Sequence, residues 1–154
     1  MEVKEPMHEI ILNLHVHTSL SDGQATYQDI ANAAVATGID AVIITDHNVL
    51  PVGLEGYYEA FGQRVLLLTG EEIHDQGRDP QKDHLLVFNS NKDLSQYSED
   101  TNNLLKQVCA MGGMSFIAHP IDMELKAINE PNIGEVVIVP GLPDSRGLYY
   151  FTYR

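Results

Sequence analysis

Short apolar runs alternate along this chain with segments of helical periodicity, and this alternation limits the folds that are open to it. Residues 40–45 (Asp-Ala-Val-Ile-Ile-Thr) form a continuous β-prone run, as expected for a strand that is buried on both faces. Residues 26–37 carry apolar side chains at helical spacing, and Gly38 follows them as a typical helix stop. We therefore expect an α/β fold, with a mostly parallel sheet and helices packed against it.

The other expected elements continue this alternation in a chain of 154 residues, a length that suits one domain spanning residues 1–154. Strands are predicted at residues 10–14, 65–69, 84–88, 114–118 and 135–139, and helices at residues 54–62 and 104–111. In α/β sheets and barrels the functional side chains lie just beyond the carboxyl ends of the strands. Polar residues at those positions are therefore the first candidates for a site.

Histidine and acidic residues do occupy the predicted strand ends. His15 and His17 follow the first strand at positions i and i+2, so both imidazoles point to the same side of an extended chain. The next loop carries Asp22, and a later strand begins at His84. The full set of candidates is His15, His17, Asp22, His47, the pair Glu71 and Glu72, His84 and His119, whereas His8 and His74 lie outside the pattern.

Imidazole and carboxylate ligands without thiolates suit zinc, manganese or iron at catalytic rather than structural sites. Because one ion needs about four to six ligands, this number of candidates indicates two or three ions. A carboxylate such as Glu72 can bridge two ions, and ions about 3.5–4 Å apart can hold a hydroxide and clamp a phosphoryl or acyl oxygen. Each motif alone also fits a structural role, as a packed histidine or a capped turn. Their shared position at strand ends favours metal binding.

The chain carries 9 basic and 22 acidic residues, a net charge of −13 with histidine neutral. Such a surface repels nucleic acid and anionic membranes, so we expect neither as a partner, although bound cations would make the site itself locally positive. The N-terminus lacks the apolar segment of a secretory signal. The single Cys109, which lies on a predicted helix and is expected in the protein core, cannot form an intramolecular disulfide. Both features fit a cytoplasmic protein.

Six motifs stand in order between residues 10 and 120: residues 14–18 (Leu-His-Val-His-Thr), 21–23 (Ser-Asp-Gly), 44–48 (Ile-Thr-Asp-His-Asn) and 70–72 (Gly-Glu-Glu), then His84 and residues 118–120 (Ala-His-Pro). Together they resemble the PHP (polymerase and histidinol phosphatase) family. The resemblance implies a distorted barrel of about seven βα units with a two- or three-metal site. It also implies Glu72 rather than Glu71 as a ligand, because the family pattern is Gly-x-Glu. The implied ligand set is His15, His17, Asp22, His47, Glu72, His84 and His119.

Two features depart from the family pattern. No histidine follows His119, so the late Asp-x-His motif that closes the family's metal site is missing, and a full βα barrel usually needs about 200 residues or more. We therefore expect a (βα)7-type barrel that is short or incomplete at the C-terminus: a fragment, an open barrel, or a barrel completed by a second subunit. The subunit contact would be made by an aromatic segment that could also be an ordinary edge strand, Tyr149, Tyr150, Phe151 and Tyr153.

The leading functional hypothesis is a metal-dependent phosphoesterase that acts on a small phosphorylated or ester substrate through a metal-bridged hydroxide. Arg78 lies between Glu72 and His84, and it could contact the substrate anion or be an ordinary solvated arginine. A carboxylester or carbamate hydrolase would use the same metal site. A non-catalytic metal-binding module is the third hypothesis, and the missing late motif favours it.

Overall fold

A computed structural model describes residues 9–79, 81, 84–118, 138–139 and 150–151. Of the positions singled out by the sequence, His119, Tyr149 and Tyr153 lie outside these residues, as does most of the strand expected at residues 135–139. The part of that strand that the structure describes is β7 (Ile138–Val139), which pairs antiparallel with β8 (Tyr150–Phe151).

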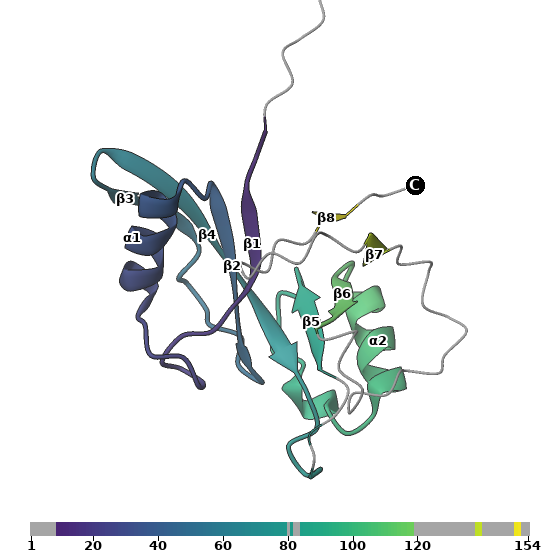
Figure 1. Ribbon diagram of the computed structural model, residues 1–154. Helices are drawn as coiled ribbons and strands as arrows, with labels where there is room; N and C mark the ends of the chain where they lie inside the picture. The colour runs from purple at the N-terminus through teal and green to yellow at the C-terminus, as the bar shows by residue number, and fades with distance from the viewer. Residues whose placement is uncertain (1–8, 80, 82–83, 119–137, 140–149, 152–154) are drawn as a thin grey trace, which may run out of the picture.

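The main sheet has six strands and curls into part of a barrel (Figure 1). Its hydrogen-bonded order is β1-β2-β4-β5-β6, and β3 pairs with β4 outside this path. The central strand β4 therefore has β2 along one edge, and β3 followed by β5 along the other. The bounds are β1 Leu12–Val16, β2 Ala41–His47, β3 Gly56–Ala60, β4 Gln63–Ile73, β5 Leu85–Phe88 and β6 Met114–Ile117.

The strand directions are mixed, so the expectation of a mostly parallel sheet is wrong. β1 pairs with β2, and β2 with β4, in parallel. The pairs β3–β4, β4–β5 and β5–β6 are antiparallel. Apolar runs of similar length occur in buried strands of either direction, so periodicity alone could not distinguish them. As a result, the start of β5 lies at the same edge of the sheet as the carboxyl ends of β1, β2 and β4.

The helix expected at residues 54–62 is absent there, and these residues instead supply β3 and the turn of a hairpin with β4. Exposure alternates along β3, as in a strand with one covered face. The turn consists of Phe61 (φ 52°) and Gly62 (φ 74°), and two left-handed residues in a row are typical of a two-residue hairpin turn. The adjacent, β-prone Tyr57 and Tyr58 were the signal for a strand at this position.

The helix expected at residues 26–37 is confirmed as α1 (Tyr27–Thr37). Thr26 and Asp29 form a capping box at its start, in which the Asp29 N–H donates to Thr26 Oγ1 (3.3 Å) and the Thr26 N–H donates to Asp29 Oδ2 (2.9 Å). Gly38 ends the helix with a left-handed φ of 75°. Each of these signals is local, so it could be recognised in the sequence.

The second helix, α2 (Thr101–Ala110), begins three residues before the expected range of 104–111, because the side chain of Asp100 caps its first turn. Leu104 and Val108 form its buried face. Cys109 is exposed, so its predicted place in the core is wrong. Successive residues on a helix point about 100° apart, and the residue after Val108 has turned toward solvent.

Three apolar clusters divide the core between the two faces of the sheet. The first packs α1 on β2 and β4, and the second packs α2 on β5 (Figure 1). Successive strand residues face opposite sides, so the odd-numbered β4 residues from Val65 to Ile73 face the helices. The third cluster lies on the face opposite the helices and consists of Leu86, Phe88 and Ala118, with Leu14, Ile43 and Phe116 against them.

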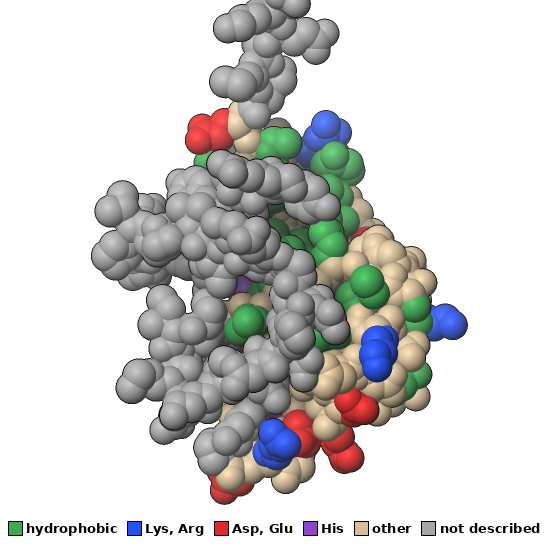
Figure 2. Space-filling view, turned by 90° about the vertical axis from the view of Figure 1, so that its right-hand side faces the viewer, with side chains coloured by type: hydrophobic (Ala, Val, Ile, Leu, Met, Phe, Trp, Pro, Cys, Tyr) green, Lys and Arg blue, Asp and Glu red, His purple; other side chains and the backbone are tan. Residues whose placement is uncertain are grey.

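The surface combines apolar and acidic areas. Figure 2 shows hydrophobic side chains in a band on one face and acidic side chains toward its lower edge. Among the helices that the structure describes, none has both the length and the hydrophobicity required to cross a membrane.

Candidate metal centre

One edge of the sheet brings together side chains from four strand ends. β1, β2 and β4 run parallel, so their carboxyl ends share this edge, and β5 runs the opposite way and starts there. The structure gathers six of the seven sequence-predicted ligands at this edge, while His119 lies outside the described residues. These six form what we call the histidine–carboxylate cluster: His15, His17, Asp22, His47, Glu72 and His84.

Glu72 lies at the centre of the histidine–carboxylate cluster, with a fully buried side chain. Its Oε2 is 2.9 Å from His15 Nε2 and 3.0 Å from His17 Nε2. Its Oε1 is 2.9 Å from His84 Nδ1. The two Nε2 atoms of His15 and His17 also lie 2.8 Å from each other. A neutral imidazole has a single N–H, so electron-pair donors this close together are better satisfied by a shared cation than by one another.

Asp22 and His47 extend the cluster toward solvent. Asp22 Oδ1 is 3.2 Å from His17 Nδ1, and Asp22 Oδ2 is 3.5 Å from His47 Nε2. The Asp22 side chain is 67% exposed, whereas that of His47 is 21% exposed. The open side of the cluster therefore lies at Asp22, where a ligand from solvent can approach.

The protonation states of Glu72 and His47 favour cation binding, whereas a proton on His17 would compete with a cation. Burial raises the pKa of Glu72, but hydrogen bonds from His15, His17 and His84 outweigh it and hold this pKa well below its usual range. Burial lowers the pKa of His47, while the hydrogen bond to Glu72 raises the pKa of His17. The buried Nδ1 atoms of His17 and His47 make no well-aligned hydrogen bond among the described residues, although Asp22 Oδ1 lies 3.2 Å from the first and Glu72 Oε2 lies 3.5 Å from the second. An ionised carboxylate and unsatisfied imidazole nitrogens are what a divalent cation takes as ligands.

The donor atoms form three overlapping groups, each with its atoms within 4.8 Å of one another. Neighbouring groups share a residue, which fits two or three cations held side by side. Nitrogen and oxygen donors without sulfur suit zinc, manganese or iron. The groups are His15, His17 and Glu72; His17, Asp22 and His47; and His47, Glu72 and His84.

Asp46 fixes the loop that carries Asp22. Its carboxylate is fully buried and accepts three hydrogen bonds of 2.7 Å, two from the N–H and O–H of Thr18 and one from the O–H of Ser21. Gly23 completes the loop, since a Cβ at this position would lie 2.4 Å from a backbone carbonyl oxygen across it. The sequence pattern included Asp46 only as the neighbour of His47. Its partners are 25 and 28 residues away, so no local signal could reveal them.

His74, which the sequence pattern left outside the site, lies against the cluster and is 3% exposed. Its ring stacks on that of His84 and meets that of His47 edge-on. Burial lowers the pKa of His74, and positive charge on His84 and His47 lowers it further. One signal for this residue was present in the sequence, because His74 stands at i+2 from Glu72, the spacing that places two strand residues on one side.

Glu71 lies on the helix-covered face of β4, away from the cluster. It is fully buried, and its Oε2 accepts a hydrogen bond from the Leu94 N–H (3.1 Å). Burial raises its pKa to about 8. Of the two adjacent glutamates, the structure thus places Glu72, and not Glu71, beside the imidazoles.

Arg78 lies on an exposed loop after β4. Its side chain is 55% exposed, and its Nε is 3.2 Å from Asp75 Oδ2. The structure therefore places it outside the histidine–carboxylate cluster.

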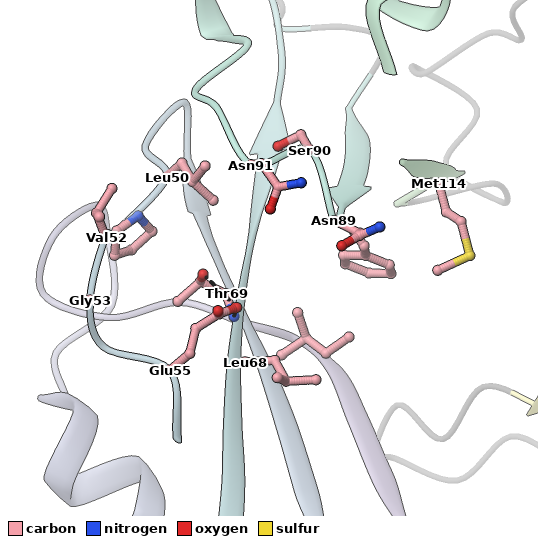
Figure 3. A pocket seen from close by; sticks show the side chains of 13 residues that line it. Leu50, Val52, Gly53, Glu55, Leu68, Thr69, Asn89, Ser90, Asn91 and Met114 are labelled. Atoms are coloured by element: carbon pink, nitrogen blue, oxygen red, sulfur yellow. Dashed lines mark hydrogen bonds between the residues drawn. The ribbon is translucent and has the colours of Figure 1, made fainter. Parts of the chain in front are cut away.

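A pocket of about 340 Å³ lies apart from the cluster, beside the middle of β4 (Figure 3). Along β4, the pairing with β3 reaches only to Leu67, and the pairing with β5 starts only at Gly70. Glu55 takes the place of a neighbouring strand, accepting hydrogen bonds of 3.0 Å from the N–H and O–H of Thr69. The lining of the pocket contains no member of the histidine–carboxylate cluster and includes Ile43, Leu50, Leu68, Phe88, Asn89 and Met114.

Comparison with known proteins identifies a family for this arrangement. The family model of the PHP domain matches residues 13–118, more than half of the chain, and this span contains the whole histidine–carboxylate cluster. The comparisons with curated proteins and with solved structures gave no match. By the extent of the family match, and with the cluster inside it, this chain belongs to the PHP domain family.

Proposed function

We propose that this chain is a metal-dependent phosphoesterase. The observation that carries the proposal is the convergence of three imidazoles on the two oxygens of the buried Glu72, in a family that includes metal-dependent phosphoesterases. The proposed ligands of two or three divalent ions (zinc, manganese or iron) are His15, His17, Asp22, His47, Glu72, His84 and His119.

The two oxygens of Glu72 face different sets of donors, which supports more than one ion. Oε2 faces His15 and His17, and Oε1 faces His84. A carboxylate placed in this way can bridge two cations. Asp22, on the open side, supports a further cation at the entrance of the site.

His119 is part of the proposal because of the residue before it. The N–H of Ala118 donates to the carbonyl oxygen of His84 (3.0 Å), so the described segment 84–118 ends at the same edge of the sheet as the cluster. His119 is the next residue in the sequence.

Divalent ions held here would lower the pKa of a coordinated water and offset the charge of phosphoryl oxygens. The second effect matters for this protein, because its net charge of −13 otherwise repels an anionic substrate. Arg78 is our proposed contact for the substrate anion, since its loop leaves β4 at His74, beside the cluster.

The test is to measure bound metal by plasma mass spectrometry together with turnover of p-nitrophenyl phosphate and p-nitrophenyl acetate. Wild type is compared with Glu72→Gln and with Glu99→Gln, the same substitution at an exposed position outside the cluster. We expect two or three equivalents of metal and phosphate ester hydrolysis in wild type and Glu99→Gln, and a loss of both in Glu72→Gln. In Arg78→Ala we expect bound metal to be retained and KM for the phosphate ester to rise.

Other results would replace the proposal. Hydrolysis of the acetate but not of the phosphate would identify a carboxylester or carbamate hydrolase on the same site. Bound metal without turnover of either ester would identify a non-catalytic metal-binding module. Wild type without bound metal would reject the metal centre altogether.

A further inference from the structure

The ring of His74 packs against two members of the histidine–carboxylate cluster from outside. It is almost parallel to the His84 ring, with an interplanar angle of 9° and ring centroids 4.4 Å apart. It meets the His47 ring at 89°, with centroids 4.8 Å apart. His47 and His84 are themselves 5.5 Å apart and also at 89°. His74 therefore contacts both rings.

The backbone of His74 is held in place by the residue that follows His47. The His74 N–H donates to Asn48 Oδ1, and Asn48 Nδ2 donates to the His74 carbonyl oxygen, both at 3.1 Å. The Asn48 N–H also donates to the carbonyl oxygen of Glu72 (3.0 Å). Asn48 has a left-handed φ of 51°, which asparagine adopts more readily than most residues. These bonds connect the end of β2 to the end of β4 and hold the backbone from which the His74 ring extends.

We propose that His74 is a positioning residue for the metal centre: its ring holds the His84 and His47 rings in the orientations in which their nitrogens meet Glu72. This inference rests on the proposed function, since it assigns a role toward the metal ligands. Imidazole rings that are offset and stacked attract one another, and a buried ring leaves its neighbour little freedom to turn.

The buried Nδ1 of His74, like those of His17 and His47, makes no hydrogen bond among the described residues, but the grouping of donor atoms supports positioning rather than direct ligation. Among the described residues, His74 belongs to none of the three donor groups, although it touches members of two of them. His84 is already fixed within its ring plane by the contact of its Nδ1 with Glu72 Oε1 (2.9 Å). Stacking restrains the same ring from its face, so the two contacts together define its orientation.

The experiment is a titration of the metal-free full chain with Co²⁺. Binding is measured by calorimetry and by the visible absorption of the bound ion. It compares wild type with His74→Ala, which removes the stacked ring, and with His74→Phe, which keeps a ring of similar size and removes the nitrogens. We expect His74→Ala to weaken at least one Co²⁺ site by about 10- to 100-fold and to change the visible spectrum. His74→Phe should bind Co²⁺ with nearly wild-type affinity and spectrum.

A control separates positioning from a general loss of stability. Leu104→Ala removes a side chain that is 2% exposed in the α2 cluster, away from the metal centre, and it should destabilise the fold without changing the Co²⁺ affinity or spectrum. The proposal is overturned if Leu104→Ala weakens Co²⁺ binding as much as His74→Ala does. It is also overturned if His74→Phe behaves like His74→Ala, because the nitrogen would then be required, or if His74→Ala behaves like wild type. Absence of Co²⁺ binding in wild type would instead reject the proposed function.

Discussion

Glu71 and Glu72 are neighbours in β4, yet their environments leave Glu71 neutral and Glu72 negatively charged at neutral pH. Successive strand residues face opposite sides of a sheet, so one carboxyl points toward the helices and the other toward the imidazoles. Burial among apolar groups raises the pKa of Glu71 to about 8. Burial acts on Glu72 as well, but hydrogen bonds from three histidines keep that carboxylate ionised. At the scale of single residues, the partner of a buried carboxyl decides its charge.

The raised pKa of Glu71 predicts a specific pH dependence of stability. Its folded pKa of about 8 exceeds its ordinary value of 4.5, so between these values the folded state binds a proton that the unfolded state has lost. The contribution of Glu71 to stability is therefore complete below about pH 4.5 and is lost as the pH rises through 8. Glu71→Gln keeps the shape of the neutral acid but has no proton to lose, so its stability should not fall for this reason as the pH rises.

The measurement is the free energy of unfolding of both proteins in urea from pH 5 to pH 9. One pKa unit corresponds to about 1.4 kcal/mol, so the stability of wild type relative to Glu71→Gln should fall by roughly 2–4 kcal/mol over this range. A difference that does not depend on pH would show that Glu71 titrates normally in the folded protein.

Site residues that form a local pattern in the sequence could be predicted from it. Site residues whose role depends on hydrogen bonds to partners far away in the sequence could not. His15 and His17 were recognisable because two positions along a strand bring side chains to one side. Asp46 and Asn48 support the site through hydrogen bonds to residues 25 to 28 positions away. Such contacts exist only once the strands have paired, so they leave no periodic pattern in the sequence.

The same distinction holds for whole elements. α1 could be predicted because its cap and its stop lie within the helix sequence itself. The direction of β5 could not be read from periodicity, because apolar runs of similar length occur in buried strands of either direction. Although the direction of β5 was predicted wrongly, His84 still lies in the cluster where it was expected. An antiparallel strand begins where its parallel neighbours end, so a histidine just before β5 reaches the same edge as those just after β1 and β2.

The β3–β4 hairpin offers a test of turn chemistry at a position away from the metal centre. Phe61 adopts a φ of 52° and is 82% exposed, so it has a conformation unfavourable for a bulky residue and buries little apolar area. Phe61→Asn would create the Asn-Gly sequence that this two-residue turn prefers. We expect the free energy of unfolding to rise by about 0.5–1 kcal/mol, measured by urea denaturation.

Phe61→Ala serves as the control, because it removes the exposed ring without the left-handed preference of asparagine. If both substitutions change stability equally, the gain comes from the loss of the ring and not from the turn. A lower stability of Phe61→Asn would contradict the prediction.

At the scale of the whole molecule, the histidine–carboxylate cluster connects strands that are far apart in the sequence. Its members come from the ends of β1, β2 and β4, the start of β5 and the loop before α1. The protein also carries 22 acidic against 9 basic residues. In the absence of cations, repulsion among these negative charges therefore opposes the placement of carboxylates close together in the cluster. Bound cations would both relieve this repulsion and tie the strand ends together. Stability and metal binding are therefore expected to be coupled across the fold.

This coupling predicts that bound metal raises the stability of the fold. A ligand that binds only the folded state adds RT ln(1 + [L]/Kd) to its stability, which is about 2.7 kcal/mol per site at a free concentration of 100 Kd. We expect Zn²⁺ to raise the thermal unfolding temperature of the wild-type chain, and EDTA to reverse the rise. Glu72→Gln should show a much smaller rise, whereas Glu99→Gln, outside the cluster, should respond like wild type. Because protons compete with the metal for imidazole ligands, the rise should shrink below about pH 6. An equal rise in Glu72→Gln would place the stabilising ion somewhere other than at this edge of the sheet.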